Sequence, residues 1–188
     1  MMNDVMTRKV VNGLDLDVLG ATAQAIGEDP VLGQVRFSVT TRWDGQTRST
    51  SRVNGYALAG EQIAREFEIV ADEPLELLGT NTAPNPQELL MAAVNACMTV
   101  GYVAGAAMQD ITLDRLEIET TGQLDLRGFL GLDETVPPGY GQIDYVVRIA
   151  GNGTPDQFDA IHQAVMATSP NYFNMARPIR MNGTLAIG

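Results

Sequence analysis

The sequence predicts a mixed fold of strands and helices, and two kinds of pattern support that prediction. Apolar and polar residues alternate over 35–43 and again over 142–149, which is typical of strands with one buried face. Capping sequences begin at Asn85 and at Thr154, and each precedes apolar residues at helical spacing. We therefore expect strands, a long helix, more strands and a shorter helix, in that order.

The N-terminal part divides into a weakly patterned segment and a strand region. Residues 1–32 are expected to form an appendage with a short helix around 14–26, and residues 33–188 a single domain. Alternation over 35–43 and around Phe67 and Ile69 predicts strands, with turns at 44–45 (Asp-Gly) and 54–55 (Asn-Gly).

The long helix has a clear predicted start. Asn85 is the expected N-cap, Pro86 the first helical residue and Glu88 the reciprocal partner of a capping box, and the helix should run to about Met108. Residues 89–107 are apolar enough to raise the question of a membrane span. Ala, Gly and Met dominate this stretch and its flanks carry acids rather than Lys or Arg, so we expect a buried helix of a soluble protein.

The C-terminal part alternates again. Strands are predicted over 113–126 and 142–149, and a helix begins at Thr154 and ends at Ser169-Pro170. The Gly- and Pro-rich segment between the two strands is expected to be either a disordered insertion or a lid over a substrate, with its apolar residues as the contacts: Phe129, Leu130 and Tyr140. A last strand is predicted over 179–187.

Composition narrows the possible functions. Twelve Lys and Arg against 23 Asp and Glu give a formal net charge of −11, which opposes binding to nucleic acid or to anionic membranes. One cysteine permits no disulfide within the chain, and the start has no apolar signal region, so we expect a cytoplasmic protein.

Several kinds of site are not expected. A Cys/His metal site needs more than the one His and one Cys available, and no nucleotide-binding motif indicates a cofactor. His162 lies in the predicted second helix and is expected to be structural or solvent-facing. The segment Asp72-Glu73-Pro74 has the composition of a turn, and we expect its carboxylates to be solvated.

Cys97 admits two interpretations. Small residues at Ala93, Gly101 and Ala104 share its helical stripe, so another element can approach the sulfur closely. Free cysteine is usually a small core residue. The sulfur lies beyond the influence of the helix N-terminus and among apolar neighbours, so a reactive thiolate would need a cation from elsewhere in the fold.

The stretch DEPLELLGTNTAPNPQELLMAAVNAC, with the later SPNYFNMARPI, resembles the OsmC and organic hydroperoxide resistance family over roughly residues 35–188. The pattern P-x-E-L-L-x-A-A-x-x-x-C carries the resemblance. It implies an α+β fold, the OsmC-like fold, in an intertwined homodimer. Central cysteine-bearing helices are then surrounded by antiparallel sheets from both chains.

The resemblance also implies roles for particular residues. Cys97 is the expected peroxidatic thiol, assisted by an arginine from an N-terminal strand, where Arg48 is preferred and Arg42 remains an alternative. The expected acid is Glu88, although the hydroperoxide resistance branch has its glutamate one position earlier, where this chain has a glutamine. Ser169 stands where family peroxidases carry the resolving cysteine, which places the chain in a branch without a second cysteine.

Two functions follow as hypotheses. The first is a one-cysteine, thiol-dependent peroxidase that reduces organic hydroperoxides in oxidative stress defence and is regenerated by an external thiol reductant. The second is a non-redox binding protein for a small hydrophobic ligand, held by the homodimer and the lid. Hydrolysis by Ser169 or Cys97 is a lesser alternative, because the motif offers no base.

Overall fold

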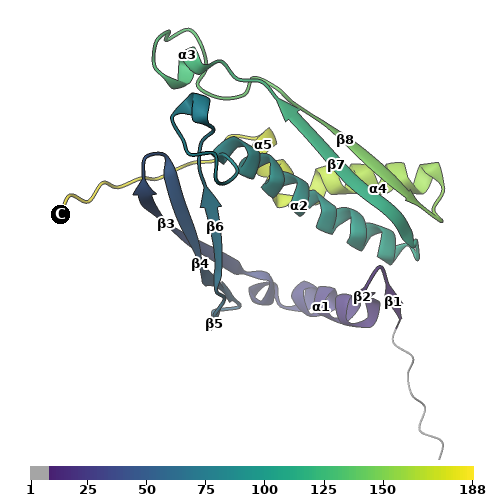
Figure 1. The fold of residues 1–188 in the computed structure, drawn as a ribbon. Coiled ribbons are helices and arrows are strands. Elements are labelled where there is room, and N and C mark those ends of the chain that lie inside the picture. Colours follow the sequence, from purple (N-terminus) through teal and green to yellow (C-terminus); the bar gives the residue numbers. More distant parts are fainter. Residues whose placement is uncertain (1–8) are drawn as a thin grey trace, which may run out of the picture. The chain divides into compact units, whose positions relative to one another are not determined.

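The computed structural model describes residues 9–188, which divide into two compact units (Figure 1). The N-terminal unit extends to Ala92 and the C-terminal unit covers Ala93–Gly188. The boundary falls within helix α2 (Pro86–Met108), so this helix contributes its first turns to one unit and the remainder to the other. The predicted domain boundary at residue 33 stays a prediction.

The N-terminal unit begins with a small hairpin and a helix. Strands β1 (Val10–Val11) and β2 (Leu14–Asp15) pair with each other, and α1 (Leu16–Glu28) follows directly. The carboxylate of Asp15 caps α1 by accepting hydrogen bonds from the backbone N–H groups of Asp17 and Val18. The helix expected around 14–26 is therefore present, followed by the 3-10 turn η1 (Pro30–Gly33).

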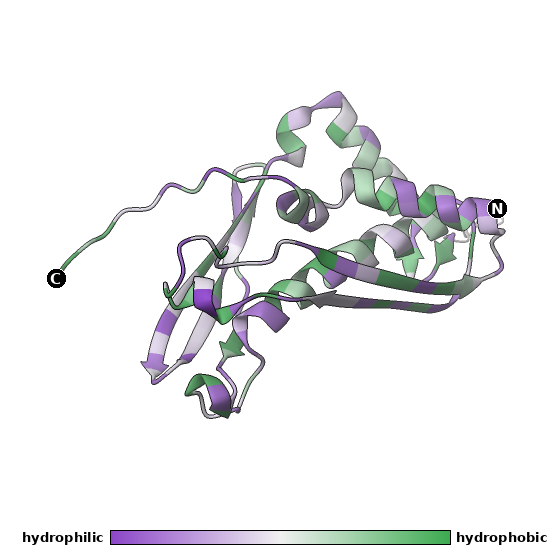
Figure 2. Ribbon diagram, turned by 90° about the horizontal axis from the view of Figure 1, so that it is seen from above, coloured by the Kyte–Doolittle hydropathy of each residue, from purple (hydrophilic) through white to green (hydrophobic). Residues whose placement is uncertain are grey.

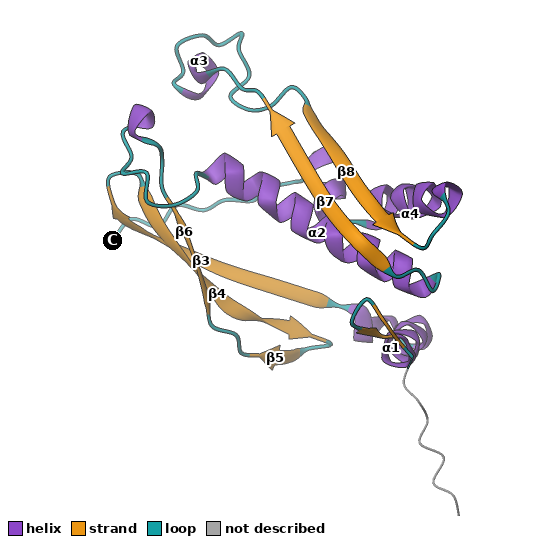
Figure 3. Cartoon of the chain, turned by 45° about the vertical axis from the view of Figure 1, so that its right-hand side comes forward, coloured by secondary structure: helices purple, strands orange, loops and turns teal. Residues whose placement is uncertain are grey.

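A four-stranded antiparallel sheet forms the rest of the N-terminal unit (Figure 3). Its long strands are β3 (Val35–Gly45) and β4 (Arg48–Leu58), and β4 also pairs with β5 (Glu61–Ile63) and β6 (Phe67–Ala71). The chain turns at Gln46, directly after the predicted Asp-Gly pair, and Gln46 has a positive φ of 46°. The first predicted turn is thus displaced by two residues, since Asp44 and Gly45 end β3 and the turn lies at 46–47.

The second predicted turn, at Asn54-Gly55, is wrong, because these residues lie inside β4. The register runs from Phe37 opposite Tyr56 to Val39 opposite Val53, so two residues of β4 face one of β3 in a β-bulge. Gly55 has φ of 84°, and a Cβ there would lie 2.4 Å from the Ile63 carbonyl oxygen. Glycine is therefore needed for the bulge, and the same dipeptide that favours a hairpin turn here kinks a continuous strand.

Helix α2 starts as predicted. The Asn85 side chain accepts from the Glu88 N–H at 2.8 Å, and the Glu88 carboxylate accepts from the Asn85 N–H at 2.8 Å. This is the reciprocal capping box, and the helix ends at the expected Met108. Among the described residues α2 is the one helix long and apolar enough to cross a membrane, and Met98, Tyr102 and Ala106 on it are buried in a protein core.

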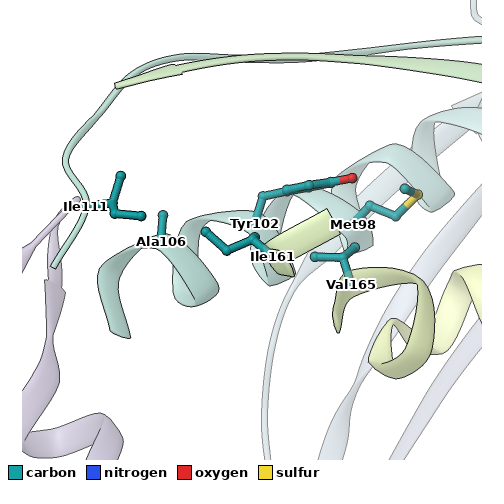
Figure 4. Packing of buried hydrophobic residues seen from close by; sticks show 6 residues of the cluster. All are labelled: Met98, Tyr102, Ala106, Ile111, Ile161 and Val165. Atoms are coloured by element: carbon teal, nitrogen blue, oxygen red, sulfur yellow. The ribbon is translucent and has the colours of Figure 1, made fainter. Parts of the chain in front are cut away.

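The C-terminal unit packs helices against one two-stranded sheet (Figure 3). Strands β7 (Leu113–Gly122) and β8 (Ile143–Gly151) form the antiparallel pair, and Figure 2 shows polar and apolar residues alternating along them. Helix α4 (Pro155–Thr168) packs beside α2, and Thr154 caps it in the predicted capping box. Figure 4 shows the core between these elements, formed by residues of three segments: Met98, Tyr102, Ala106, Ile111, Ile161 and Val165.

Of two predictions for the end of the chain, one is confirmed and one is wrong. Ser169-Pro170 does end α4, but a further short helix, α5 (Pro170–Ala176), begins at once with Ser169 as its cap. The strand predicted over 179–187 is absent, since residues 177–188 have no regular secondary structure. The apolar alternation at Ile179 and Met181 is present, but a strand also needs a neighbouring edge to pair with, and this segment has none within the described chain.

Candidate functional site

The site is built around a contact between Cys97 and Ser169 in the C-terminal unit. The Ser169 hydroxyl donates a hydrogen bond to the Cys97 sulfur at 3.4 Å. Ser169 is 6% exposed and Cys97 is partly exposed, so the pair lies at the edge of the core rather than within it. The sulfur therefore has a hydrogen-bond donor on one side and access to solvent.

Small residues of α2 allow this contact. Cys97, Gly101 and Gly105 are spaced by four residues along α2, and Ser169, Val165 and Ile161 are spaced by four in the opposite direction. A Cβ at Gly101 would lie 3.1 Å from Val165, and one at Gly105 would lie 3.1 Å from Ile161. The element that approaches the small residues of α2 closely, as the sequence predicted, is thus α4. Ser169 follows the last residue of α4 and lies against the Cys97 sulfur.

Backbone contacts hold the Ser169 hydroxyl in place. The hydroxyl oxygen of Ser169 accepts from the Tyr172 N–H at 3.4 Å, and the backbone N–H of Ser169 donates to the Val165 carbonyl at 2.8 Å. The Asn171 side-chain amide donates to the Ala93 carbonyl at 2.8 Å, which ties the start of α5 to α2. Because the oxygen accepts from α5, its hydrogen is free to point at the sulfur.

The two candidate arginines have different environments in the N-terminal unit. Arg42 forms an ion pair with Asp44 at 2.9 Å and its side chain is 81% exposed. Arg48 instead donates from Nη1 to the Thr82 hydroxyl at 2.5 Å, in the loop that leads to α2. Arg42 thus already has a surface partner, whereas Arg48 is held by a neutral group. Neither lies in the unit that contains Cys97, and the role at the sulfur stays a prediction.

Asp72 shares a hydrogen-bond partner, Thr82, with Arg48. The Asp72 side chain is fully buried, so the expectation that its carboxylate is solvated is wrong. Both carboxylate oxygens accept hydrogen bonds, from the Glu73 N–H and from the backbone or side chains of three threonines: Thr47, Thr80 and Thr82. The Thr80 hydroxyl, more than any other donor, holds the pKa of Asp72 well below its usual range, although burial alone would raise that pKa.

The sequence contained a partial signal for this burial, namely the T-x-T at 80–82, which begins eight residues after an aspartate that directly follows a strand. The two hydroxyls and two N–H groups of Thr80 and Thr82 can satisfy one carboxylate oxygen. These donors cannot be assigned to Asp72 from the sequence alone, because only the tertiary fold brings the loop at 80–82 back to this carboxylate.

Glu88 serves the helix start. Its carboxylate accepts the Asn85 N–H in the capping box and the residue is exposed. The structural task that the sequence predicted is therefore confirmed, and a catalytic role as an acid stays a prediction.

The lid segment is ordered around α3 (Leu126–Phe129). Asp125 caps α3 and pairs with Arg127 at 2.6 Å, and this salt bridge lowers the pKa of Asp125. Phe129 and Leu130 are 68% and 59% exposed, and Tyr140 is partly buried. At the base of the segment lies an open cavity of about 830 Å³, and its lining contains none of these three residues. These three side chains therefore do not line this cavity.

His162 is structural. Its Nδ1 is hydrogen-bonded to the hydroxyl of Tyr102, a side chain that is 1% exposed. Burial raises the pKa of Tyr102 well above its usual range, so the phenol keeps its proton, and the imidazole tautomer decides which of the two atoms donates. Among residues 9–188 no group of three or more His, Cys, Asp and Glu could hold a metal ion.

Comparisons with known proteins identify the family. A sequence profile described as OsmC-like protein matches residues 79–182, which include both Cys97 and Ser169. The chain belongs to the OsmC-like family. No curated protein matches the chain.

Solved structures share the fold of this OsmC-like protein. One is a protein of Psychrobacter arcticus assigned to osmotic stress induction and detoxification response, with TM-score 0.55 and 15% identity over 74% of this chain and 88% of that one. An OsmC-like protein of Mycoplasma pneumoniae has TM-score 0.55 and 17% identity over 76% and 87% of the two chains. The α+β fold expected from the resemblance is confirmed. The dimer stays a prediction.

Proposed function

We propose that this OsmC-like protein is a one-cysteine peroxidase that reduces organic hydroperoxides, with Cys97 as the attacking thiolate. The observation that carries the proposal is the buried Ser169 hydroxyl, which donates to the Cys97 sulfur at 3.4 Å. A donated hydrogen bond favours the ionised form of its acceptor. Partial exposure of Cys97 leaves a route for a small substrate.

The reaction is a two-electron oxidation of sulfur. The Cys97 thiolate attacks the terminal oxygen of the hydroperoxide, an S–O bond forms and the O–O bond breaks. The departing alkoxide takes a proton from solvent and leaves as an alcohol, while Cys97 becomes a sulfenic acid.

Regeneration requires thiols from outside the chain, because Ser169 cannot form a disulfide. A first external thiol attacks the sulfenic sulfur, water leaves and a mixed disulfide forms. A second thiol attacks the mixed disulfide, which restores Cys97 and releases an external disulfide. The cytoplasm is the compartment that supplies such thiols, and we place the protein there.

Arg48 is our choice for the cation that the thiolate needs. Arg42 already forms an ion pair with Asp44, whereas the Arg48 guanidinium donates to the hydroxyl of Thr82. An arginine bonded to a neutral group keeps its full charge available to a nearby anion. The Glu88 carboxylate caps α2, and its role as an acid in this step stays a prediction.

Stopped-flow mixing of reduced protein with cumene hydroperoxide, followed by trapping of the sulfenic acid, tests the proposal. We expect oxidation of Cys97 at a rate far above that of free cysteine, and loss of the reaction in Cys97→Ala. Ser169→Ala is the matched variant, and removal of one charge-directed donor should slow oxidation about tenfold or more. A wild-type rate equal to that of free cysteine would end the peroxidase assignment.

The working unit that we propose is a homodimer. Among residues 9–92 no hydrophobic side chain is buried. One face of the sheet instead exposes a group of large apolar residues at 45–72% exposure: Val35, Phe37, Val39, Trp43, Phe67 and Ile69. A monomer rarely leaves such a face open, and a second copy of the chain would cover it.

Light scattering after size-exclusion chromatography tests this part. We expect twice the mass of the chain, and a shift toward the monomer in Phe37→Glu, since a charge would then be buried in the interface. Arg36→Glu, on the polar face of the same strand, is the control. A monomeric wild type would refute the dimer.

The binding-protein alternative stays open through one observation, the exposed Phe129, Leu130 and Leu132 on the segment after β7. These side chains offer a surface to a small hydrophobic ligand. Native mass spectrometry of the freshly purified protein should then find a ligand that Cys97→Ala retains. Loss of that ligand in Cys97→Ala would tie binding to the thiol and count against this alternative.

A further inference from the structure

Asp72 is a buried carboxylate that the proposed reaction does not use directly. Within the N-terminal unit it is 0% exposed, yet no Lys, Arg or His forms an ion pair with it among the described residues. Six hydrogen bonds from Glu73 and three threonines satisfy it instead. Burial of a charge without an ion-pair partner costs folding free energy. This buried charge lies two hydrogen bonds away from a candidate catalytic arginine, Arg48.

Chemistry fixes one hydrogen bond between Arg48 and Asp72 and favours one direction for the other. The Arg48 guanidinium can only donate, so the Thr82 oxygen must accept from Nη1 at 2.5 Å. The hydroxyl proton of Thr82 has two acceptors at 3.0 Å, Asp72 Oδ2 and the Thr80 hydroxyl oxygen. The carboxylate is the stronger acceptor because it is charged, and it favours the orientation toward Oδ2.

We propose that Asp72 is a positioning residue for Arg48, acting through Thr82. The carboxylate holds the Thr82 proton, so the lone pairs of the hydroxyl oxygen remain directed at the guanidinium. Two hydrogen bonds in series, from a cation through a hydroxyl to an anion, polarise each other and hold Arg48 in one place. This inference rests on the proposed function, in which Arg48 supplies the cation for the thiolate.

The Thr47 and Thr80 bonds make the arrangement rigid. Thr47 belongs to the turn directly before Arg48, and its hydroxyl donates to Oδ1 at 3.0 Å. Thr80 donates to Oδ2 from its hydroxyl at 2.5 Å and from its N–H at 3.1 Å. The same carboxylate thus fixes both the backbone that carries Arg48 and the loop that carries its partner.

The chain contains a matched comparison. On the same sheet Arg42 donates to Asp44 at 2.9 Å and Thr50 donates to Asp44 at 2.5 Å. Arg42 contacts its carboxylate directly and is 81% exposed at the side chain, so no threonine lies between this cation and its anion. Thr50→Val therefore removes an equivalent threonine–aspartate bond without touching Arg48.

The test uses Thr82→Val and Asp72→Asn, with Thr82→Ser as the rescue and Thr50→Val as the control. The first readout is the ¹⁵N NMR spectrum of the Arg48 side chain in the full-length protein. We expect a resolved, slowly rotating guanidinium in the wild type and Thr82→Ser, and an averaged one in Thr82→Val and Asp72→Asn. The second readout is kcat/KM for cumene hydroperoxide, which should fall about tenfold or more in Thr82→Val and recover in Thr82→Ser.

The outcomes separate this inference from the proposed function. An unchanged Arg48 spectrum in Thr82→Val overturns the positioning role, whatever the activity. A changed spectrum together with a wild type that does not react with hydroperoxide supports the positioning and overturns the peroxidase. Thr82→Val is close to Thr in shape, so it keeps the assay meaningful even where Asp72→Asn fails to fold.

Discussion

Ser169→Cys should give this protein the disulfide chemistry that its own sequence lacks. The Ser169 oxygen and the Cys97 sulfur lie 3.4 Å apart, and a disulfide needs about 2.05 Å, so the two atoms must close by about 1.3 Å. Rotation of two side chains and a small shift at the α4–α5 junction can supply that movement. We expect hydroperoxide to convert Cys97 to a sulfenic acid that the new thiol attacks, with release of water.

The stability change follows from the length of the closed loop. The two positions are 72 residues apart, and the chain-entropy estimate for such a loop is about 4.4 kcal/mol at 25 °C. For a chain of this size that corresponds to a rise in Tm of at most about 9–18 °C in the oxidised variant relative to its reduced form. Strain in the engineered bond lowers this figure.

The assay is a thiol count before and after one equivalent of cumene hydroperoxide, with the intact mass and melting temperature of both forms. Reduced Ser169→Cys has two thiols per chain, and the oxidised form should have none, at the monomer mass in non-reducing gel electrophoresis. The double variant with Cys97→Ser is the control and should keep its thiol. Two thiols persisting in Ser169→Cys after peroxide would refute the geometry on which the site is built.

Four other predictions test the fold and its charges. The lowered pKa of Asp72 stabilises the folded state fully at pH values above about 3.9, which is the pKa of an aspartate in the unfolded chain, and this contribution is lost as the pH falls below that value. The free energy of urea unfolding between pH 5 and 3 should therefore depend less on pH in Asp72→Asn than in the wild type. Gly101→Val puts methyl groups into the 3.1 Å contact with α4 and should cost about 1–3 kcal/mol of unfolding free energy. Tyr102→Phe leaves His162 without its buried hydrogen-bond partner and should cost about 1–2 kcal/mol of unfolding free energy, and an unchanged value would contradict a stabilising role for this bond. Asn85→Ala removes half of the capping box and should cost about 1 kcal/mol, and no change would mean that Glu88 alone suffices.

The helix starts were predictable because their signals are local. A cap such as Asn85 or Thr154 and its partner three residues later satisfy each other whatever the rest of the chain does. The bulge at Gly55 was not predictable, since Asn-Gly fits a turn and a bulge equally well and the pairing of β4 with β3 and β5 decides between them. For the same reason the strand predicted over 179–187 failed: its alternation is real, but no edge in the described chain pairs with it.

The sequence by itself determined the helices with capping boxes, most of the alternating strands, the family and the identity of the lone thiol, because each depends on neighbouring residues or on one motif. Only the tertiary structure decided that Ser169 meets the Cys97 sulfur and that Asp72 is buried beneath Thr82, which is bonded to Arg48. These contacts join residues far apart in the chain, 72 positions in the first case. Their physical cause is the packing of α4 on the glycines of α2 and the return of the loop at 80–82 to a carboxylate. The small residues and the two threonines are visible in the sequence, but no short window identifies the distant residue that each of them contacts.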